Sequence, residues 1–127
     1  MKYIKAVDHP GIQHINGDIY HMLAQEDNPC LTIVKHKDRM INLHLADSNR
    51  DALGTGTLDV DALIRALYVA ACNQAGRFAT PEPLGAGGDP YPAMHGKPDP
   101  AVLDNLVKVT VDTFREREDV IREELGA

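Results

Sequence analysis

The sequence predicts an α/β fold with parallel strands, because runs of strand type alternate with segments that carry helix-start signals. Strands separated by helices pair in parallel through right-handed crossovers. The 127 residues are enough for one domain with a hydrophobic core. The expected order is strand 11–20, helix 28–37, strand 39–45, a helix from residue 59, strand 77–83 and a helix from residue 99.

The first half of the chain supplies two strands and one short helix. The segment GIQHINGDIY (11–20) has strand character, although Gly17 weakens it. Asn28 followed by Pro29 is typical of a helix start, with Asn as the N-cap and Pro in the first turn. The apolar and alternating segment RMINLHL (39–45) predicts the second strand.

The second half contains the longer helices. Asp59 can cap a helix, and Leu58 and Leu63 have the spacing of a hydrophobic staple. The segment RFATPEP (77–83) predicts a short strand, closed by proline, and a Gly/Pro-rich loop follows it. Asp99-Pro100 begins the last helix by the same cap-plus-proline pattern. Apolar side chains recur at helical spacing in both helices, namely at Val60, Leu63, Ile64, Leu67 and Ala71, and at Leu103, Leu106, Val107, Thr110 and Phe114.

Composition excludes several classes of protein. Thirteen basic against 19 acidic residues give a net charge of −6, so neither a nucleic-acid nor a membrane partner is expected. Cys30 and Cys72 cannot form a disulfide framework, and no zinc-type spacing occurs. The N-terminus lacks the apolar core of a signal peptide, and the apolar stretch 62–72 is too short to span a bilayer. A cytoplasmic location is expected.

Each predicted strand ends in a side chain that can bind a metal: Asp18, His44 and Glu82. The carboxyl ends of parallel strands lie on one side of a sheet, where the chemistry of α/β proteins is found. Two carboxylates and an imidazole suit a divalent cation such as Mn²⁺, Co²⁺ or Mg²⁺. Taken singly, each residue has a plainer interpretation: His44 as a structural histidine, Asp18 as a turn or cap residue, Glu82 as an exposed acid. The joint pattern favours a metal site. The histidines without such a pattern are interpreted as structural: His9, His14, His36 and His95.

Four segments resemble the sugar phosphate isomerase/epimerase family: GDIYHM (17–22), HLADSNR (44–50), GTLDVDALIRAL (56–67) and TPEPLGAGGDPYP (80–92). This family consists of xylose isomerase-like TIM barrels, and the chain most resembles its ketose 3-epimerase branch, of tagatose and psicose type. The resemblance implies that residues 1–127 are the C-terminal part of such a barrel domain. About three βα units would correspond to the last three strands of a (β/α)8 barrel.

The resemblance also implies roles for individual residues. Asp18, His44 and Glu82 match the positions that bind one divalent metal, and the final glutamate doubles as the catalytic acid/base. His21 and Arg50 match positions that contact the sugar, and Arg50 could otherwise be a surface ion pair. The implied reaction is proton transfer through an enediolate on a ketose or related sugar, with the metal polarising the carbonyl.

The chain has about half the roughly 250 residues of a full barrel. The resemblance therefore implies that one further glutamate ligand and a second acid/base lie outside this chain. Open strand edges, and the barrel-facing side chains Ile12, Met40 and Phe78, would need cover. A homodimer or a complementing barrel half is the expected partner. Two hypotheses follow: a sugar isomerase or epimerase that is incomplete in this chain alone, and a non-catalytic, self-associating half-barrel module.

Overall fold

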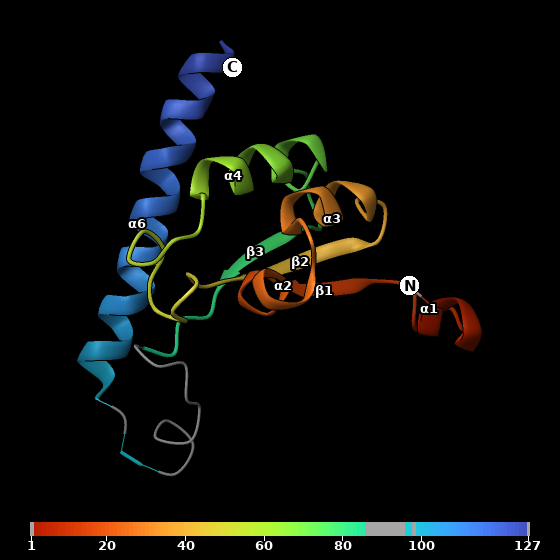
Figure 1. The fold of residues 1–127 in the computed structure, drawn as a ribbon, viewed down its shortest axis with the longest axis horizontal. Coiled ribbons are helices and arrows are strands. Elements are labelled where there is room, and N and C mark those ends of the chain that lie inside the picture. Colours follow the sequence, from red (N-terminus) through yellow and green to blue (C-terminus); the bar gives the residue numbers. More distant parts are fainter. Residues whose placement is uncertain (1, 86–95, 98, 127) are drawn as a thin grey trace.

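A parallel sheet of three strands forms the centre of the fold (Figure 1). The computed structural model describes residues 2–85, 96–97 and 99–126. The strands are β1 (Ile15–Asp18), β2 (Met40–Leu45) and β3 (Phe78–Pro81), in the order β1-β2-β3. Both neighbouring pairs are parallel, so the α/β class and the strand pairing predicted from the sequence are confirmed.

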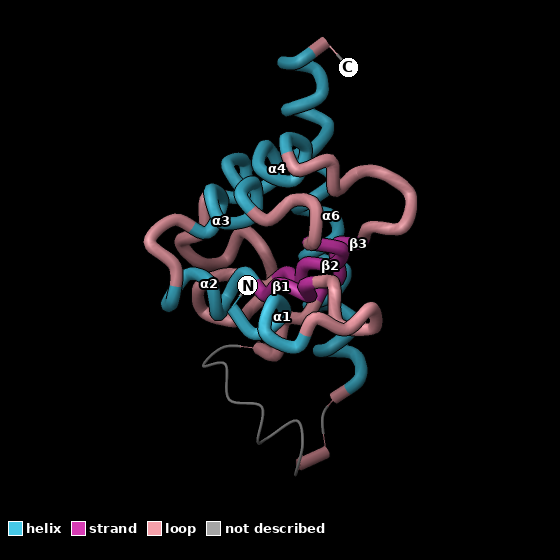
Figure 2. The backbone as a smooth tube through the Cα atoms, turned by 90° about the vertical axis from the view of Figure 1, so that its right-hand side faces the viewer, coloured by secondary structure: helices cyan, strands magenta, loops and turns pink. Residues whose placement is uncertain are grey.

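Five helices accompany the sheet in the described residues, which leave out 86–95 and 98: α1 (Lys2–Val7), α2 (Ile19–Gln25), α3 (Pro29–Lys35), α4 (Val60–Val69) and α6 (Pro100–Leu125). Helices α3 and α4 lie side by side on one face of the sheet (Figure 2). Helix α6 packs against α4 and touches β3. Helix α1 has no buried residue and lies beyond the N-terminal ends of the strands.

Helix starts follow the predicted capping residues. The side chain of Asn28 accepts a hydrogen bond from the N–H of Leu31, and Asp59 accepts one from Ala62. Asp99 caps α6 in the same way, with Pro100 in the first turn. These side chains satisfy N–H groups that have no partner within the helix, which is why they mark helix starts.

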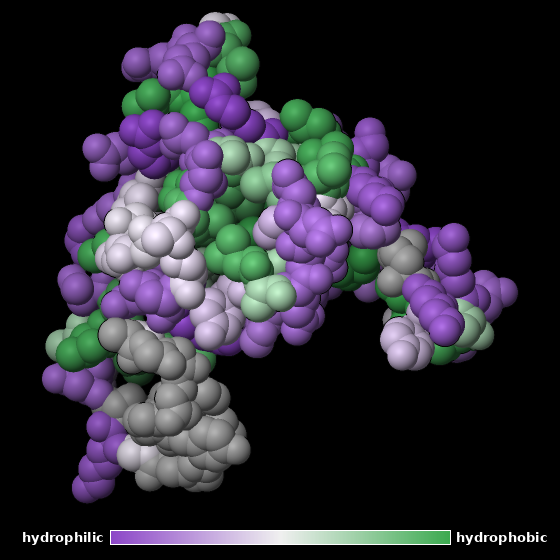
Figure 3. All heavy atoms as spheres, in the orientation of Figure 1, coloured by the Kyte–Doolittle hydropathy of each residue, from purple (hydrophilic) through white to green (hydrophobic). Residues whose placement is uncertain are grey.

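The core lies between the sheet and its helix layer. Leu43 and Leu45 of β2 are almost fully buried against Leu63 and Leu67 of α4 and Ile33 of α3. Figure 3 shows hydrophobic side chains gathered over the middle of the molecule, while the projecting α1 carries both hydrophilic and hydrophobic side chains on its surface. Burying large aliphatic side chains stabilises a fold by about 1.5–3 kcal/mol each, so this layer holds the three strands together.

The structure corrects two predictions about the first strands. β1 is shorter than the predicted 11–20, because Asp18 ends it by capping α2, a helix that the sequence did not predict. Met40 was expected among the barrel-facing side chains, with Ile12 and Phe78, but it is 2% exposed within the core. Its flexible side chain reaches the space beside Gly17, where an added Cβ would lie 2.9 Å from Met40 Sδ.

The other face of the sheet is largely uncovered by the described residues. Phe78 is 62% exposed there, and Ile12, in the segment before β1, is 48% exposed. Both β1 and β3 are edge strands in the described part of the chain. The predicted loop after Leu84, together with His95, lies mostly outside the described residues. No helix among the described residues is long and apolar enough to cross a membrane.

Candidate metal centre

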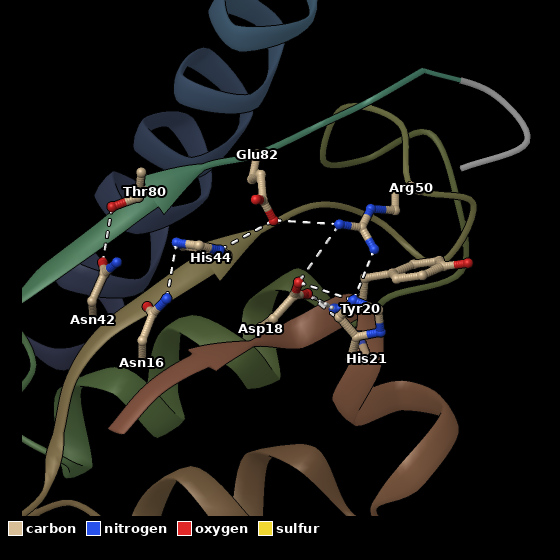
Figure 4. Close-up of polar contacts among 9 residues, drawn as sticks. All are labelled: Asn16, Asp18, Tyr20, His21, Asn42, His44, Arg50, Thr80 and Glu82. Carbon is tan, nitrogen blue, oxygen red and sulfur yellow. Dashed lines mark hydrogen bonds and ion pairs between the residues drawn. The ribbon is translucent and has the colours of Figure 1, made fainter. Parts of the chain in front are cut away.

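The strand register brings the three predicted ligands together at the C-terminal edge of the sheet. Asp18 of β1 pairs directly with His44 of β2. The chain after β3 continues alongside β2, since the N–H of Glu82 donates to the carbonyl of Leu45 at 2.8 Å. One ligand atom from each of Asp18, His44 and Glu82 lies within 4.8 Å of the others. All three point toward a common space (Figure 4).

Both ring nitrogens of His44 have polar neighbours. Nδ1 lies 3.1 Å from Oε2 of Glu82, and Nε2 lies 3.2 Å from Nδ2 of Asn16. An imidazole that binds a metal through one nitrogen needs a hydrogen-bond acceptor for the proton on the other. The amide of Asn16 can supply its oxygen after rotation by half a turn. Sequence reasoning did not select Asn16 for the site, although it lies two residues before Asp18 and alternation along a strand places such residues on one face.

Asp18 has two roles in this structure. Its Oδ1 accepts hydrogen bonds from the N–H groups of Tyr20 and His21, at 3.0 and 3.4 Å, and so caps α2. Its Oδ2 faces the other site residues, 3.5 Å from His21 Nε2 and 3.8 Å from Arg50 Nη2. The capping interpretation and the ligand interpretation are therefore compatible, because they use different oxygens.

Arg50, which the resemblance implied only as a sugar contact, lies directly beside two of the predicted ligands, Asp18 and Glu82. Its Nη2 lies 3.5 Å from Oε2 of Glu82, and its Nη1 lies 2.9 Å from Nε2 of His21. Its guanidinium carbon stands 4.7 Å from the ring centroid of Tyr20, a distance typical of a cation–π contact. Tyr20 is a second site residue that the sequence analysis missed, and such a contact across the fold leaves no sequence signal.

The backbone and side chain of Arg50 are both unusual. Its φ is 61°, in the left-handed region that non-glycine residues rarely adopt. Its Nε is buried and has no hydrogen-bond partner within the described part of the chain. Strained residues and unpaired buried donors concentrate at functional sites. The two residues in contact with the guanidinium, Tyr20 and His21, also line a cavity of about 470 Å³, together with Leu23, Ala24 and Ser48.

Comparison with known proteins finds similarity to sugar epimerases. A 3-dehydro-D-guloside 4-epimerase of Escherichia coli (strain K12) is 39% identical over 66 residues, which are 52% of this chain and 25% of that protein. The chain resembles sugar epimerases. Solved structures agree in fold: an L-ribulose 3-epimerase matches with a TM-score of 0.68 at 19% identity, covering 89% of this chain and 38% of that one.

A D-psicose 3-epimerase from Clostridium cellulolyticum H10, solved with D-tagatose, also has a TM-score of 0.68, at 21% identity over 92% of this chain and 42% of that one. The resemblance drawn from the sequence motifs is thus confirmed. No family model matches the chain. The chain spans a quarter of the curated relative and about two fifths of these solved epimerases.

Proposed function

We propose that this chain is part of a metal-dependent sugar isomerase or epimerase. Residues 1–127 would form the C-terminal part of a barrel domain, with β1, β2 and β3 as the last three strands of a (β/α)8 barrel. The observation that carries the proposal is the convergence of Asp18, His44 and Glu82 within 4.8 Å at the carboxyl ends of three parallel strands. The similarity to sugar epimerases supports the substrate class.

The donor set fits a divalent cation. Two carboxylates and one imidazole suit Mn²⁺, Co²⁺ or Mg²⁺, and the ligand atoms are already gathered without a backbone rearrangement. When bound, the cation would polarise the carbonyl of the sugar and stabilise the negative charge that develops on its oxygen. Asn16 would hold the His44 ring in the orientation that binding needs.

The remaining residues of the site would act on the sugar itself. Glu82 is the most exposed of the three ligands, with 38% of its side chain accessible, so its carboxylate can reach a substrate carbon and exchange a proton with it. His21 and Arg50 would orient sugar hydroxyls beside it.

The partner expected for this function is more protein. The unpaired edges of β1 and β3, and the exposed Phe78 on the uncovered sheet face, need cover in the described structure. A second copy of the chain or a complementing barrel half would supply it, together with further ligands. A non-catalytic, self-associating module would need the same cover but no metal, so metal binding separates the two hypotheses.

The test is a calorimetric titration of Mn²⁺ into three forms of the protein: the wild type, His44→Ala, and His14→Ala as a matched control. His14 is exposed and precedes β1. We expect the wild type and His14→Ala to bind equally, and His44→Ala to lose binding because its imidazole is the nitrogen donor of the set. Equal binding by His44→Ala would refute the site. Failure of all three forms to bind would favour the non-catalytic module.

A further inference from the structure

The segment that carries His44 and Arg50 also contains an acidic residue, Asp47, whose role the metal site does not explain. Asp47 follows β2, three residues after His44 and three before Arg50, and it is fully buried. Buried carboxylates are rare unless they are paired or hydrogen-bonded. Asp47 does not belong to the ligand cluster.

The partners of Asp47 are backbone N–H groups of the loop that follows it. Its Oδ1 accepts hydrogen bonds from Ser48 at 2.6 Å and Leu58 at 3.0 Å, and its Oδ2 accepts one from Gly54 at 2.8 Å. Burial alone would raise the pKa of Asp47. The N–H groups of Leu58, Ser48, Gly56 and Gly54 together hold that pKa below its usual value. The carboxylate is therefore ionised at neutral pH and fixes both ends of the loop 48–58.

Two glycines allow the loop to close around this carboxylate. A Cβ added at Gly56 would lie 2.2 Å from Oδ1 of Asp47, so no larger residue fits without moving the carboxylate. Gly54 has a φ of +85°, a conformation that side-chain-bearing residues rarely adopt. The loop is thus shaped to direct several N–H groups at one buried side chain.

The turn that carries Arg50 is closed by backbone hydrogen bonds, and it begins at Asp47, the residue whose carboxylate holds the loop 48–58. The N–H of Arg50 donates to the carbonyl of Asp47 at 2.9 Å, and the N–H of Asp47 donates to the carbonyl of Asp51 at 3.0 Å. The carbonyl of Arg50 in turn accepts from the N–H of Leu84 at 2.9 Å, two residues after Glu82. A turn closed at both ends in this way can hold Arg50 at its strained φ of 61°.

We propose that Asp47 is a positioning residue: by organising the loop 48–58 it holds the Arg50 guanidinium between His21, Glu82 and the Tyr20 ring. The consequence for sugar binding rests on the proposed function. The placement of Arg50 itself does not, and it can be measured without metal or sugar. The two can therefore fail separately.

The primary readout is NMR of the Arg50 side chain. The guanidinium carbon of Arg50 lies 4.7 Å from the Tyr20 ring centroid, so the ring current of Tyr20 should shift the chemical shifts of the Arg50 side chain. The part of this shift that is lost in Tyr20→Leu is the displacement caused by the ring. In Asp47→Asn we expect at least half of the displacement to disappear. The asparagine amide accepts hydrogen bonds only at its oxygen, so its NH₂ group cannot replace the second carboxylate oxygen and the loop 48–58 loses part of its anchor. Asp51→Asn is the matched control: it is the same substitution in the same loop, at a residue whose carboxylate accepts the N–H of Ala52. It should keep the displacement.

Gly56→Ala provides a second variant should Asp47→Asn unfold, because it displaces the carboxylate while leaving the charge in the protein. Core methyl signals, such as those of Leu63, report whether each variant is folded. A folded Asp47→Asn or Gly56→Ala that retains the full displacement would overturn the proposal.

A double-mutant cycle of Asp47→Asn and Arg50→Gln tests the consequence for sugar binding, measured on Mn²⁺-loaded protein with D-tagatose as the probe. Asp47→Asn should weaken sugar binding at least tenfold in the wild-type background and have little effect in an Arg50→Gln background, because the two changes act through one side chain. Additive losses would overturn the proposal. A wild type that binds Mn²⁺ but no ketose would count against the proposed function alone, and the NMR result would still decide the role of Asp47.

Discussion

The guanidinium of Arg50 lies beside the carboxylates that we propose as metal ligands, so removing its charge should strengthen metal binding. Its Nη2 is 3.5 Å from Glu82 Oε2 and 3.8 Å from Asp18 Oδ2. A cation bound by these oxygens at roughly 2.0–2.6 Å would lie within roughly 6 Å of the guanidinium. At that separation, charges of +2 and +1 repel by about 1.4 kcal/mol in water and about 5.5 kcal/mol at an effective dielectric constant of about 20.

The lower figure corresponds to about a tenfold change in affinity, so we expect Arg50→Gln to bind Mn²⁺ at least tenfold more tightly than the wild type. Glutamine keeps much of the side-chain length and the same backbone strain. Arg50→Lys keeps the charge and should stay near the wild type. Arg65→Gln is the control for net charge, because Arg65 pairs with Glu124 on the surface. Calorimetric titration at fixed ionic strength measures all four proteins. An Arg50→Gln affinity equal to or below that of the wild type would refute the electrostatic reasoning.

Three further predictions concern stability and assembly. Gly17→Ala should lower the free energy of unfolding by about 1–3 kcal/mol in urea titrations, because its Cβ would lie 2.8 Å from Leu43 Cδ1; an unchanged midpoint would contradict the packing. The folded-state pKa of Asp47 is depressed below 3.8, so its stabilisation is present above that value and is lost as the pH falls through the folded-state pKa. The melting temperature of Asp47→Asn should therefore fall less than that of the wild type between about pH 5 and about pH 2. Sedimentation at micromolar concentration should show self-association through the open edges, and a well-folded monomer would count against it.

The sequence predicted the helix starts well, because the signal and the structure are local. Asn28, Asp59 and Asp99 each cap a helix at the expected residue. The same local logic missed α2, although Asp18 had been considered as a turn or cap residue and does cap this helix. The strand predicted over residues 11–20 extended past Asp18 and so covered the first turn of α2.

The candidate site was predictable to the extent that strand ends of a parallel sheet must meet. Asp18, His44 and Glu82 were expected together on this ground, and their atoms do lie together. The contacts of Arg50 with the carboxylates, and those of Asn16 and Tyr20, depend on a turn with positive φ and on the register between strands. Neither can be read from residue spacing. Met40 was misplaced for a related reason: strict alternation assumes a regular ladder, but the pairing shifts between Ile15 and Asn16.

The open edge of the sheet and the candidate site meet at one residue. Glu82 follows β3, an edge strand in the described residues, and its link to the sheet is the hydrogen bond from its N–H to Leu45. Asp18 and His44 lie on strands that pair with each other and cover the buried core. Glu82 is thus the least constrained of the three proposed ligands. A further strand paired along β3 would hold its backbone from both sides, and fixing a ligand before binding reduces the entropy lost on binding. Completion of the sheet should therefore tighten the metal site even where the added strand contributes no ligand of its own.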